Sequence, residues 1–273
     1  LQIDKVYKTQ NLLPTLRVNY NFLNKGYEFT NPLNTALYNN NYKAGLQFGL
    51  PLFLRQARGD LKQAKIKFPI DRIVDIGSGD AYVIHTLVEK GLAREYYAID
   101  TAYTPEVVAQ LKKNNNNSQV VYFQSLREYL STVTSEKPTL FLCMDVLEHL
   151  EDEKIILDDL NKESNDNYYF FAVPAFQSVF SSHDVLLGHY RRYTLNQLKS
   201  VLDHNQFKII DKGYYFTSLL IFRNLDKWLK KDKKESIDNW DAGKFKTGLI
   251  NTMLTVDFKI SLVLKKVGIT IPG

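Results

Sequence analysis

Residues 72–81 read Arg-Ile-Val-Asp-Ile-Gly-Ser-Gly-Asp-Ala, the pattern of a buried strand that runs into a glycine turn. A helical pattern follows over residues 81–90, and Gly91 is placed to end it at the C′ position. Glycine permits a tight turn and a close approach of backbone to ligand, while the start of a helix offers unpaired N–H groups. This order of elements favours a ligand site at the carboxyl end of a parallel strand.

Short apolar strands and helical stretches alternate along the chain on the C-terminal side of this turn. Further strands are expected at residues 95–100, 119–124, 139–145, 168–173 and 207–215. Helices are expected from Thr104 to about Lys113, over residues 151–160, and from a capping box at residues 194–197 to about Asp203. The alternation predicts an α/β fold with a doubly wound, mostly parallel, Rossmann-like sheet.

The two ends of the chain differ from this core. Residues 1–68 are rich in aromatics and Asn, and we expect a helical N-terminal cap over the site. Residues 69–215 form the predicted core. Residues 216–273 have apolar positions at helical spacing, which predicts a C-terminal helical extension that leads into a last strand, in a natural protein that continues past Gly273.

Composition narrows the class of protein. The single cysteine, Cys143, excludes an internal disulfide and a Cys-rich zinc site, and its apolar neighbours predict a buried thiol. No apolar stretch approaches the roughly 20 residues that span a bilayer, so cytoplasmic residence is the simplest expectation. A cluster of Lys and Arg at residues 223–234 fits either a peripheral membrane contact or a solvated helix face. The net charge of +5 is mild, which with the lack of an RNA-binding motif argues against a nucleic-acid partner.

The glycine turn admits two cofactor classes. Asp100 follows the next predicted strand, 23 residues after Gly77, where an acid can bind ribose hydroxyls. The NAD fingerprint requires a third glycine where this chain has Tyr82. Asp75 would repel a pyrophosphate, whereas it suits a ligand that carries an ammonium and a sulfonium. The charges therefore favour S-adenosylmethionine (SAM), with NAD as the alternative.

The motifs also resemble those of a known family. Residues 75–81 resemble the first motif of class I SAM-dependent methyltransferases, with Ala81 in place of the last glycine, and Asp100 matches their ribose-binding acid. Residues 144–150, MDVLEHL, resemble a motif after strand four in the branch that includes the ubiquinone-pathway O-methyltransferases. Residues 181–184 and 188–194 resemble a segment common in bacterial methyltransferases.

The resemblance covers residues 70–215 and implies a seven-stranded sheet with SAM at the carboxyl edge of its strands. It places adenine near residues 124–126 and the methionine moiety near Asp145. The residues expected to bind the donor are Asp75, Gly77, Ser78, Gly79, Asp100, Thr101, Ser125, Leu126 and Asp145.

A methyltransferase must position the acceptor atom toward the methyl group of the donor. It also needs a base where the acceptor keeps its proton near neutral pH. His149 and His183 are the predicted bases, although His149 at the start of a helix also fits a purely structural role. His189, Arg191 and Arg192 are predicted to bind the substrate. Either arginine fits an anionic acceptor, or a structural pair with Asp184 or Glu148.

No metal is assigned from the sequence, because the spacing of Asp145, Glu148, His149 and Asp152 matches no dedicated motif. The leading hypothesis is an O- or N-methyltransferase that acts on a small-molecule acceptor, lipid-linked or sugar-linked ones included. An NAD-dependent oxidoreductase and a non-catalytic SAM-binding protein are the alternatives, and an RNA methyltransferase is disfavoured.

Overall fold

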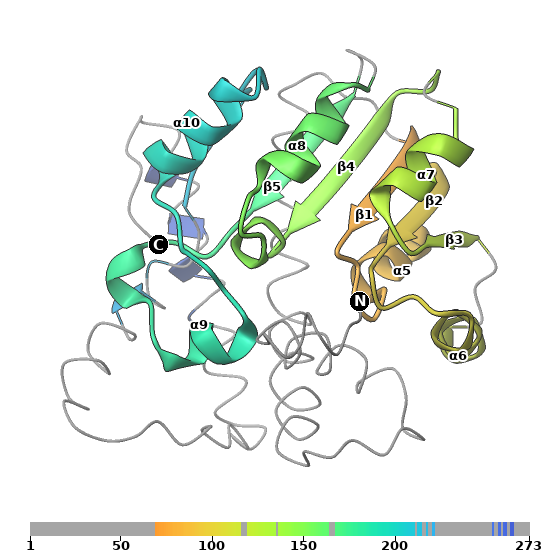
Figure 1. Ribbon diagram of the computed structural model, residues 1–273, viewed down its shortest axis with the longest axis horizontal. Coiled ribbons are helices and arrows are strands. Elements are labelled where there is room, and N and C mark those ends of the chain that lie inside the picture. The colour runs from red at the N-terminus through yellow and green to blue at the C-terminus, as the bar shows by residue number, and fades with distance from the viewer. Residues whose placement is uncertain are drawn as a thin grey trace.

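The computed structural model describes residues 69–115, 119–134, 136–163, 167–210 and 212–214, together with scattered residues between 217 and 264. Its centre is a parallel sheet of five strands in the order β3-β2-β1-β4-β5 (Figure 1). The strands are β1 (Ile70–Ile76), β2 (Ala93–Ile99), β3 (Val120–Phe123), β4 (Thr139–Met144) and β5 (Tyr168–Ala172). Each lies within two residues of its predicted bounds. β4 and β5 are near-continuous apolar runs, which are typical of strands covered on both faces.

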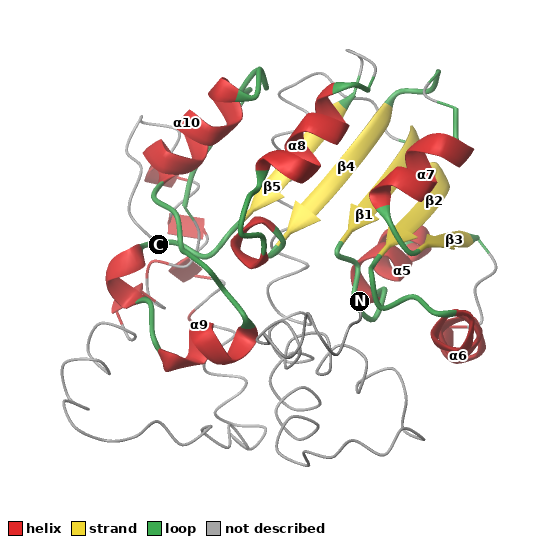
Figure 2. Ribbon diagram, in the orientation of Figure 1, coloured by secondary structure: helices red, strands yellow, loops and turns green. Residues whose placement is uncertain are grey.

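The helices that connect the strands cover both faces of the sheet (Figure 2). They are α5 (Tyr82–Glu89), α6 (Pro105–Asn115), α7 (Leu126–Thr132) and α8 (Lys154–Asn161). Two further helices, α9 (Ser182–Leu187) and α10 (Leu195–His204), follow β5, and short 3-10 turns lie at Leu147–His149 and Gln177–Val179. Helix α10 has the predicted capping box. The backbone N–H of Gln197 donates to Thr194 Oγ1, and the backbone N–H of Thr194 donates to Gln197 Oε1.

Alternate residues of each strand enter two separate cores. Ile73 and Tyr96 pack with α5 and α6 on one face, whereas Val74, Phe141 and Phe123 pack with α7 and α8 on the other. Cys143 lies in a third cluster with residues of α8 and α10, where 1% of its surface is exposed, and the expectation of a buried thiol is confirmed. Helices on both faces make the sheet doubly wound.

The strand order reverses between β1 and β4. From β1 the chain crosses to β2 and β3 on one side, then returns to β4 and β5 on the other. Open α/β sheets bind ligands outside the carboxyl ends of the strands at such a reversal. The glycine turn after β1 and Asp145 after β4 both lie at this point, which is why the fold brings them together.

The expected sixth strand at residues 207–215 is wrong for its described part, because residues 207–210 and 212–214 form no strand. The chain leaves α10 through Gln206, which has a φ of 65°. Phe207 and Ile209 then pack against the third cluster, and the Phe207 ring lies edge-on to Tyr169 and Phe171 of β5. The alternating apolar pattern thus comes from packing rather than from strand pairing.

The expected N-terminal cap over residues 1–68 lies outside the described residues, and so does most of the expected extension over residues 216–273. Within the part of the chain that the structure describes, no helix has the length and apolar character needed to cross a membrane. The described residues form five of the seven strands that the family resemblance implies, and the other two strands remain a prediction.

Candidate functional site

The glycine turn is fixed to the neighbouring strand by its backbone. The amides of Gly77 and Ser78 both donate to the Ile99 carbonyl at the end of β2, at 2.8 and 3.0 Å. Gly77 has a φ of 71° and Gly79 a φ of 53°, a left-handed conformation that a residue with a Cβ adopts at a cost. Ala81 also has a left-handed φ of 59° at the start of α5, so the third small residue of the motif takes up strain there.

Gly77 also lies against the loop after β4. A Cβ at Gly77 would come within 2.5 Å of Val146 Cγ2, which is closer than such atoms approach in real proteins. The two loops at the strand reversal are therefore in contact, and glycine is required at this position both by φ and by space.

Asp100 closes the turn from the β2 side. Its carboxylate accepts from the amide of Gly79 at 2.9 Å and from the amide of Ala102 at 2.9 Å. Burial raises the pKa of Asp100, and these two N–H groups oppose that rise. A carboxylate has about four lone-pair positions, so each oxygen keeps one for a further donor such as a ribose hydroxyl.

Asp75 lies at the base of the turn with 2% of its surface exposed and accepts from Ser78 Oγ at 2.7 Å. Burial raises the pKa of Asp75 to about 7. The Ser78 hydrogen bond opposes this, and the charges of Asp100 and Asp80 add to it. Sequence reasoning missed Asp80, although it directly follows the second glycine. Three carboxylates therefore share this turn, and their mutual repulsion favours a cationic ligand.

The predicted adenine-side residues lie after β3. Ser125 is the N-cap of α7, where its Oγ accepts from the Glu128 amide at 3.1 Å. Leu126 is 8% exposed and packs in the core beside Phe123, while Thr101 is exposed at the end of β2. The structure thus gives Ser125 and Leu126 structural contacts, and their role toward a donor stays a prediction.

Asp145 follows β4 at the strand reversal. It is exposed, its φ is 52°, and its amide donates to the Ala172 carbonyl of β5 at 2.9 Å. The left-handed backbone turns the chain into the 3-10 turn Leu147–His149. Backbone strain of this kind clusters at functional sites.

His149 and His189 meet although 40 positions separate them in the sequence (189 − 149). Their ring centroids are 4.6 Å apart and their planes are nearly perpendicular. Burial, and then the neighbouring His189, lower the pKa of His149 to about 4. His149 is therefore neutral at pH 7, and its low pKa makes it a weak base.

Asp184, at the third position of α9, organises the segment that carries His189. It is fully buried, caps its own helix through the Ser181 amide at 2.9 Å, and accepts from His189 Nδ1 at 2.9 Å and Arg192 Nε at 2.8 Å. Burial would raise the pKa of Asp184, but the hydrogen bonds from His189 and Arg192 outweigh it and hold that pKa below its ordinary value. The Ser181-x-x-Asp184 spacing is a capping-box signal that could have revealed this role.

The two arginines differ in their contacts. Arg192 is buried, pairs with Asp184 and donates to the Ala175 carbonyl, which is the structural alternative considered for it. Arg191 pairs with Glu153 and the Glu151 carbonyl. A role for either in binding an acceptor stays a prediction. His183 lies within α9, but the direction of its side chain is outside the described part of the structure.

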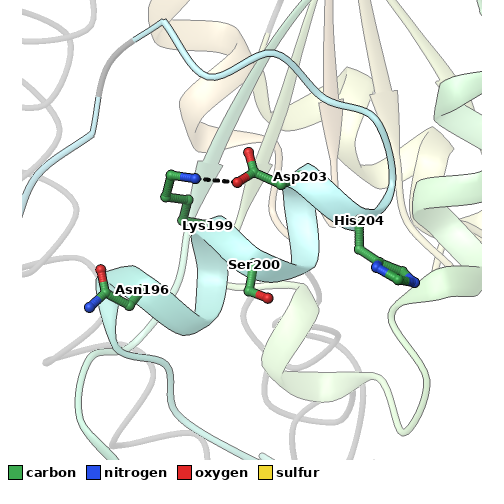
Figure 3. A pocket seen from close by; sticks show the side chains of 5 residues that line it. All are labelled: Asn196, Lys199, Ser200, Asp203 and His204. Atoms are coloured by element: carbon green, nitrogen blue, oxygen red, sulfur yellow. Dashed lines mark hydrogen bonds and ion pairs between the residues drawn. The ribbon is translucent and has the colours of Figure 1, made fainter.

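A separate hollow lies along α10 (Figure 3). It is lined by Asn196, Lys199, Ser200, Asp203 and His204, all from one face of that helix. Lys199 and Asp203 form an ion pair across it. No other element lines this hollow among the described residues, and it includes none of the predicted site residues, so it does not compete with the strand reversal.

Two solved structures are similar to this chain at low sequence identity. No protein-family model matches the chain, and no curated protein does. The magnesium protoporphyrin IX methyltransferase of Synechocystis PCC 6803, solved with bound SAH, has 15% identity over 76% of this chain and 89% of its own, with a TM-score of 0.47. A SAM-dependent methyltransferase from Archaeoglobus fulgidus has 17% identity over 79% of this chain and 91% of its own, with a TM-score of 0.44.

Both of these neighbours are methyltransferases. No single family is shown for this chain. The fold and the site together define a Rossmann-like α/β protein whose candidate ligand site lies at the reversal between β1 and β4.

Proposed function

We propose that this protein is a SAM-dependent methyltransferase that transfers a methyl group to an oxygen or nitrogen atom of a small-molecule acceptor. One observation carries the proposal: the buried Asp75 carboxylate within the glycine turn, beside Asp80 and Asp100. SAM brings an ammonium and a sulfonium to such a site, and each positive charge lowers the cost of keeping these carboxylates ionised.

The same charges disfavour the NAD alternative. A Rossmann pyrophosphate lies on the backbone N–H groups of a glycine turn at a helix start. Here the Gly79 amide already donates to Asp100, and Asp75 is buried in the same turn. A diphosphate would therefore meet two carboxylates where it needs donors.

The acceptor enters next to the donor at the carboxyl edge of β4. Methyl transfer is an in-line displacement, and the enzyme contributes mainly by aligning the acceptor atom with the methyl–sulfur axis. Asp145 and His149 lie at this edge, and His189 is held beside them by Asp184. Acceptors of this description include lipid-linked and sugar-linked small molecules.

Variants at Asp100 test the donor site. Asp100→Ala removes the carboxylate proposed to accept from a ribose hydroxyl, and a hydrogen bond to a charged group contributes about 1.5–3 kcal/mol to binding. Calorimetry is therefore expected to show that the variant binds SAM about 10- to 100-fold more weakly than the wild type. Asp158→Ala removes an exposed carboxylate from α8 and is expected to bind SAM like the wild type. Equal SAM affinity in both variants, with native circular dichroism, would contradict the ribose assignment.

Turnover is tested with SAM that carries a labelled methyl group, incubated with the protein and a library of small-molecule acceptors. Transfer of label to a hydroxyl or amine is the expected result. A protein that binds SAM tightly but transfers label to no acceptor would support the non-catalytic alternative.

A further inference from the structure

Glu148 is a fully buried acid that lies beside Asp145. Its exposed fraction is 0%, and among the described residues no hydrogen-bond donor reaches either oxygen of its carboxylate. The Asp145 and Glu148 side chains can hydrogen-bond to each other only while one of them is protonated; when both are ionised, Glu148 is a buried charge next to another carboxylate. A buried charge of this kind persists in proteins when it is paired or coordinates a metal.

The imidazoles of His149 and His189 lie next to the Glu148 carboxyl group. One ligand atom from each of Glu148, His149 and His189 lies within 4.8 Å of the other two. A tetrahedral ion with bonds of about 2.1 Å holds its ligand atoms about 3.4 Å apart, so side-chain movements of about 1 Å bring the three atoms to coordination distance. Within the described chain, His149 Nδ1 is also buried and has no hydrogen-bond partner.

Each imidazole has a second contact that orients it. His189 Nδ1 is 2.9 Å from Asp184 Oδ1, and because a carboxylate accepts, Nδ1 carries the proton and Nε2 keeps its lone pair. His149 has a hydrogen bond with the Gly188 backbone, which leaves Nδ1 as its unpaired nitrogen. Metal-binding histidines almost always have such a carboxylate or carbonyl partner on the opposite nitrogen.

We propose that Glu148, His149 and His189 bind a divalent first-row transition-metal cation at the carboxyl edge of β4. One carboxylate and two imidazoles suit Mn²⁺, Co²⁺ and Zn²⁺. Asp145, which lies beside Glu148 and is exposed, offers a further oxygen donor next to these three residues. This proposal departs from the sequence-based assignment of no metal, because the fold brings His189 next to His149, which lies 40 positions earlier in the sequence.

The cation also indicates which class of acceptor the protein methylates, an inference that rests on the proposed methyltransferase function. It selects an acceptor that carries a hydroxyl, whose oxygen binds the cation and whose pKa falls as a result. The hydroxyl proton leaves to solvent, the oxygen forms a bond to the methyl carbon, and the carbon–sulfur bond breaks to leave S-adenosylhomocysteine. His149 serves as a ligand of the cation in this arrangement, rather than as the base.

The test uses the full chain after treatment with EDTA and gel filtration. Calorimetric titration with MnCl₂, and Co²⁺ absorption spectra, are expected to show one ion per chain. Glu148→Gln and His189→Ala are each expected to weaken Mn²⁺ binding at least 100-fold. His204→Ala removes an exposed histidine of α10 and is expected to leave binding unchanged.

A chain that binds no Mn²⁺, Co²⁺ or Zn²⁺ at millimolar concentration overturns the proposal. So does Mn²⁺ binding that is the same in Glu148→Gln, His189→Ala and wild type. If Glu148→Gln does not fold, His149→Asn provides the second ligand variant. SAM titration of the EDTA-treated protein separates the two proposals: retained SAM binding without metal binding refutes the metal site alone, and metal binding without SAM binding refutes the donor site alone.

Discussion

Gly77→Ala probes the contact between the two loops at the strand reversal. The new Cβ has a backbone φ of 71° and approaches Val146 Cγ2 to 2.5 Å. A left-handed residue with a Cβ costs about 1–2 kcal/mol, and overpacking a well-filled site costs about 1–3 kcal/mol more. We therefore expect Gly77→Ala to lower the free energy of unfolding by about 2–5 kcal/mol, measured by urea denaturation at 25 °C.

Gly91 supplies a matched control, because its φ is 58° and a Cβ there meets nothing within 4 Å. Gly91→Ala is expected to lose about 1–2 kcal/mol, the cost of the left-handed backbone alone. Val146→Ala combined with Gly77→Ala relieves the overlap, so the double variant is expected to recover about 1–3 kcal/mol relative to the sum of the single changes. Equal losses in Gly77→Ala and Gly91→Ala, or strictly additive effects of Val146→Ala, would refute the reasoning.

Three further predictions concern buried groups. The pKa of Asp75 is about 7 in the folded protein against an ordinary 3.8, so the folded state without ligand binds this proton more tightly than the unfolded state. Relative to Asp75→Asn, the free energy of unfolding of the wild type is therefore expected to fall by up to about 4 kcal/mol as the pH rises from 4 to 7. Curves of stability against pH that run parallel for the two proteins would contradict this. Arg192→Met leaves the Asp184 carboxylate buried without its guanidinium partner, and is expected to lower the free energy of unfolding by about 3–5 kcal/mol in urea denaturation. The double variant Arg192→Met with Asp184→Asn is expected to lose less stability than Arg192→Met, and a larger loss in the double variant would show that the two residues do not form a structural pair. Cys143 is 1% exposed, so a thiol reagent is expected to modify it at the rate of unfolding, and immediate modification of the native protein would contradict its burial.

The strands and the glycine turn were predictable from sequence because local signals determine them. The strand β1 has the apolar residues Ile73, Val74 and Ile76 just before the glycine turn, and Gly91 ends α5 at C′, where its amide donates to the Val88 carbonyl. Helix α7 was missed although Ser125-x-x-Glu128 is a cap signal, because residues 124–126 were interpreted as a ligand loop. The segment at Phe207 was predicted as a strand because packing against a helix cluster and strand pairing leave the same alternating pattern.

The contacts around His149 and Arg192 were less predictable, since they join distant parts of the chain. Glu148 and His149 are adjacent in sequence, but nothing local indicates that His189 packs on His149. The partner of Arg192 was one of two acids considered, and the choice of Asp184 depends on how α9 folds back over the β4 edge. Long-range pairing of this kind follows from tertiary structure rather than from residue spacing.

Calorimetric titrations of the full chain with SAM and with NAD, at the same pH and ionic strength, test the central electrostatic claim most directly. The three carboxylates at the glycine turn predict one SAM bound per chain and no heat from NAD at the same concentration. NAD binding at this crevice, or the absence of SAM binding, would contradict the proposed function.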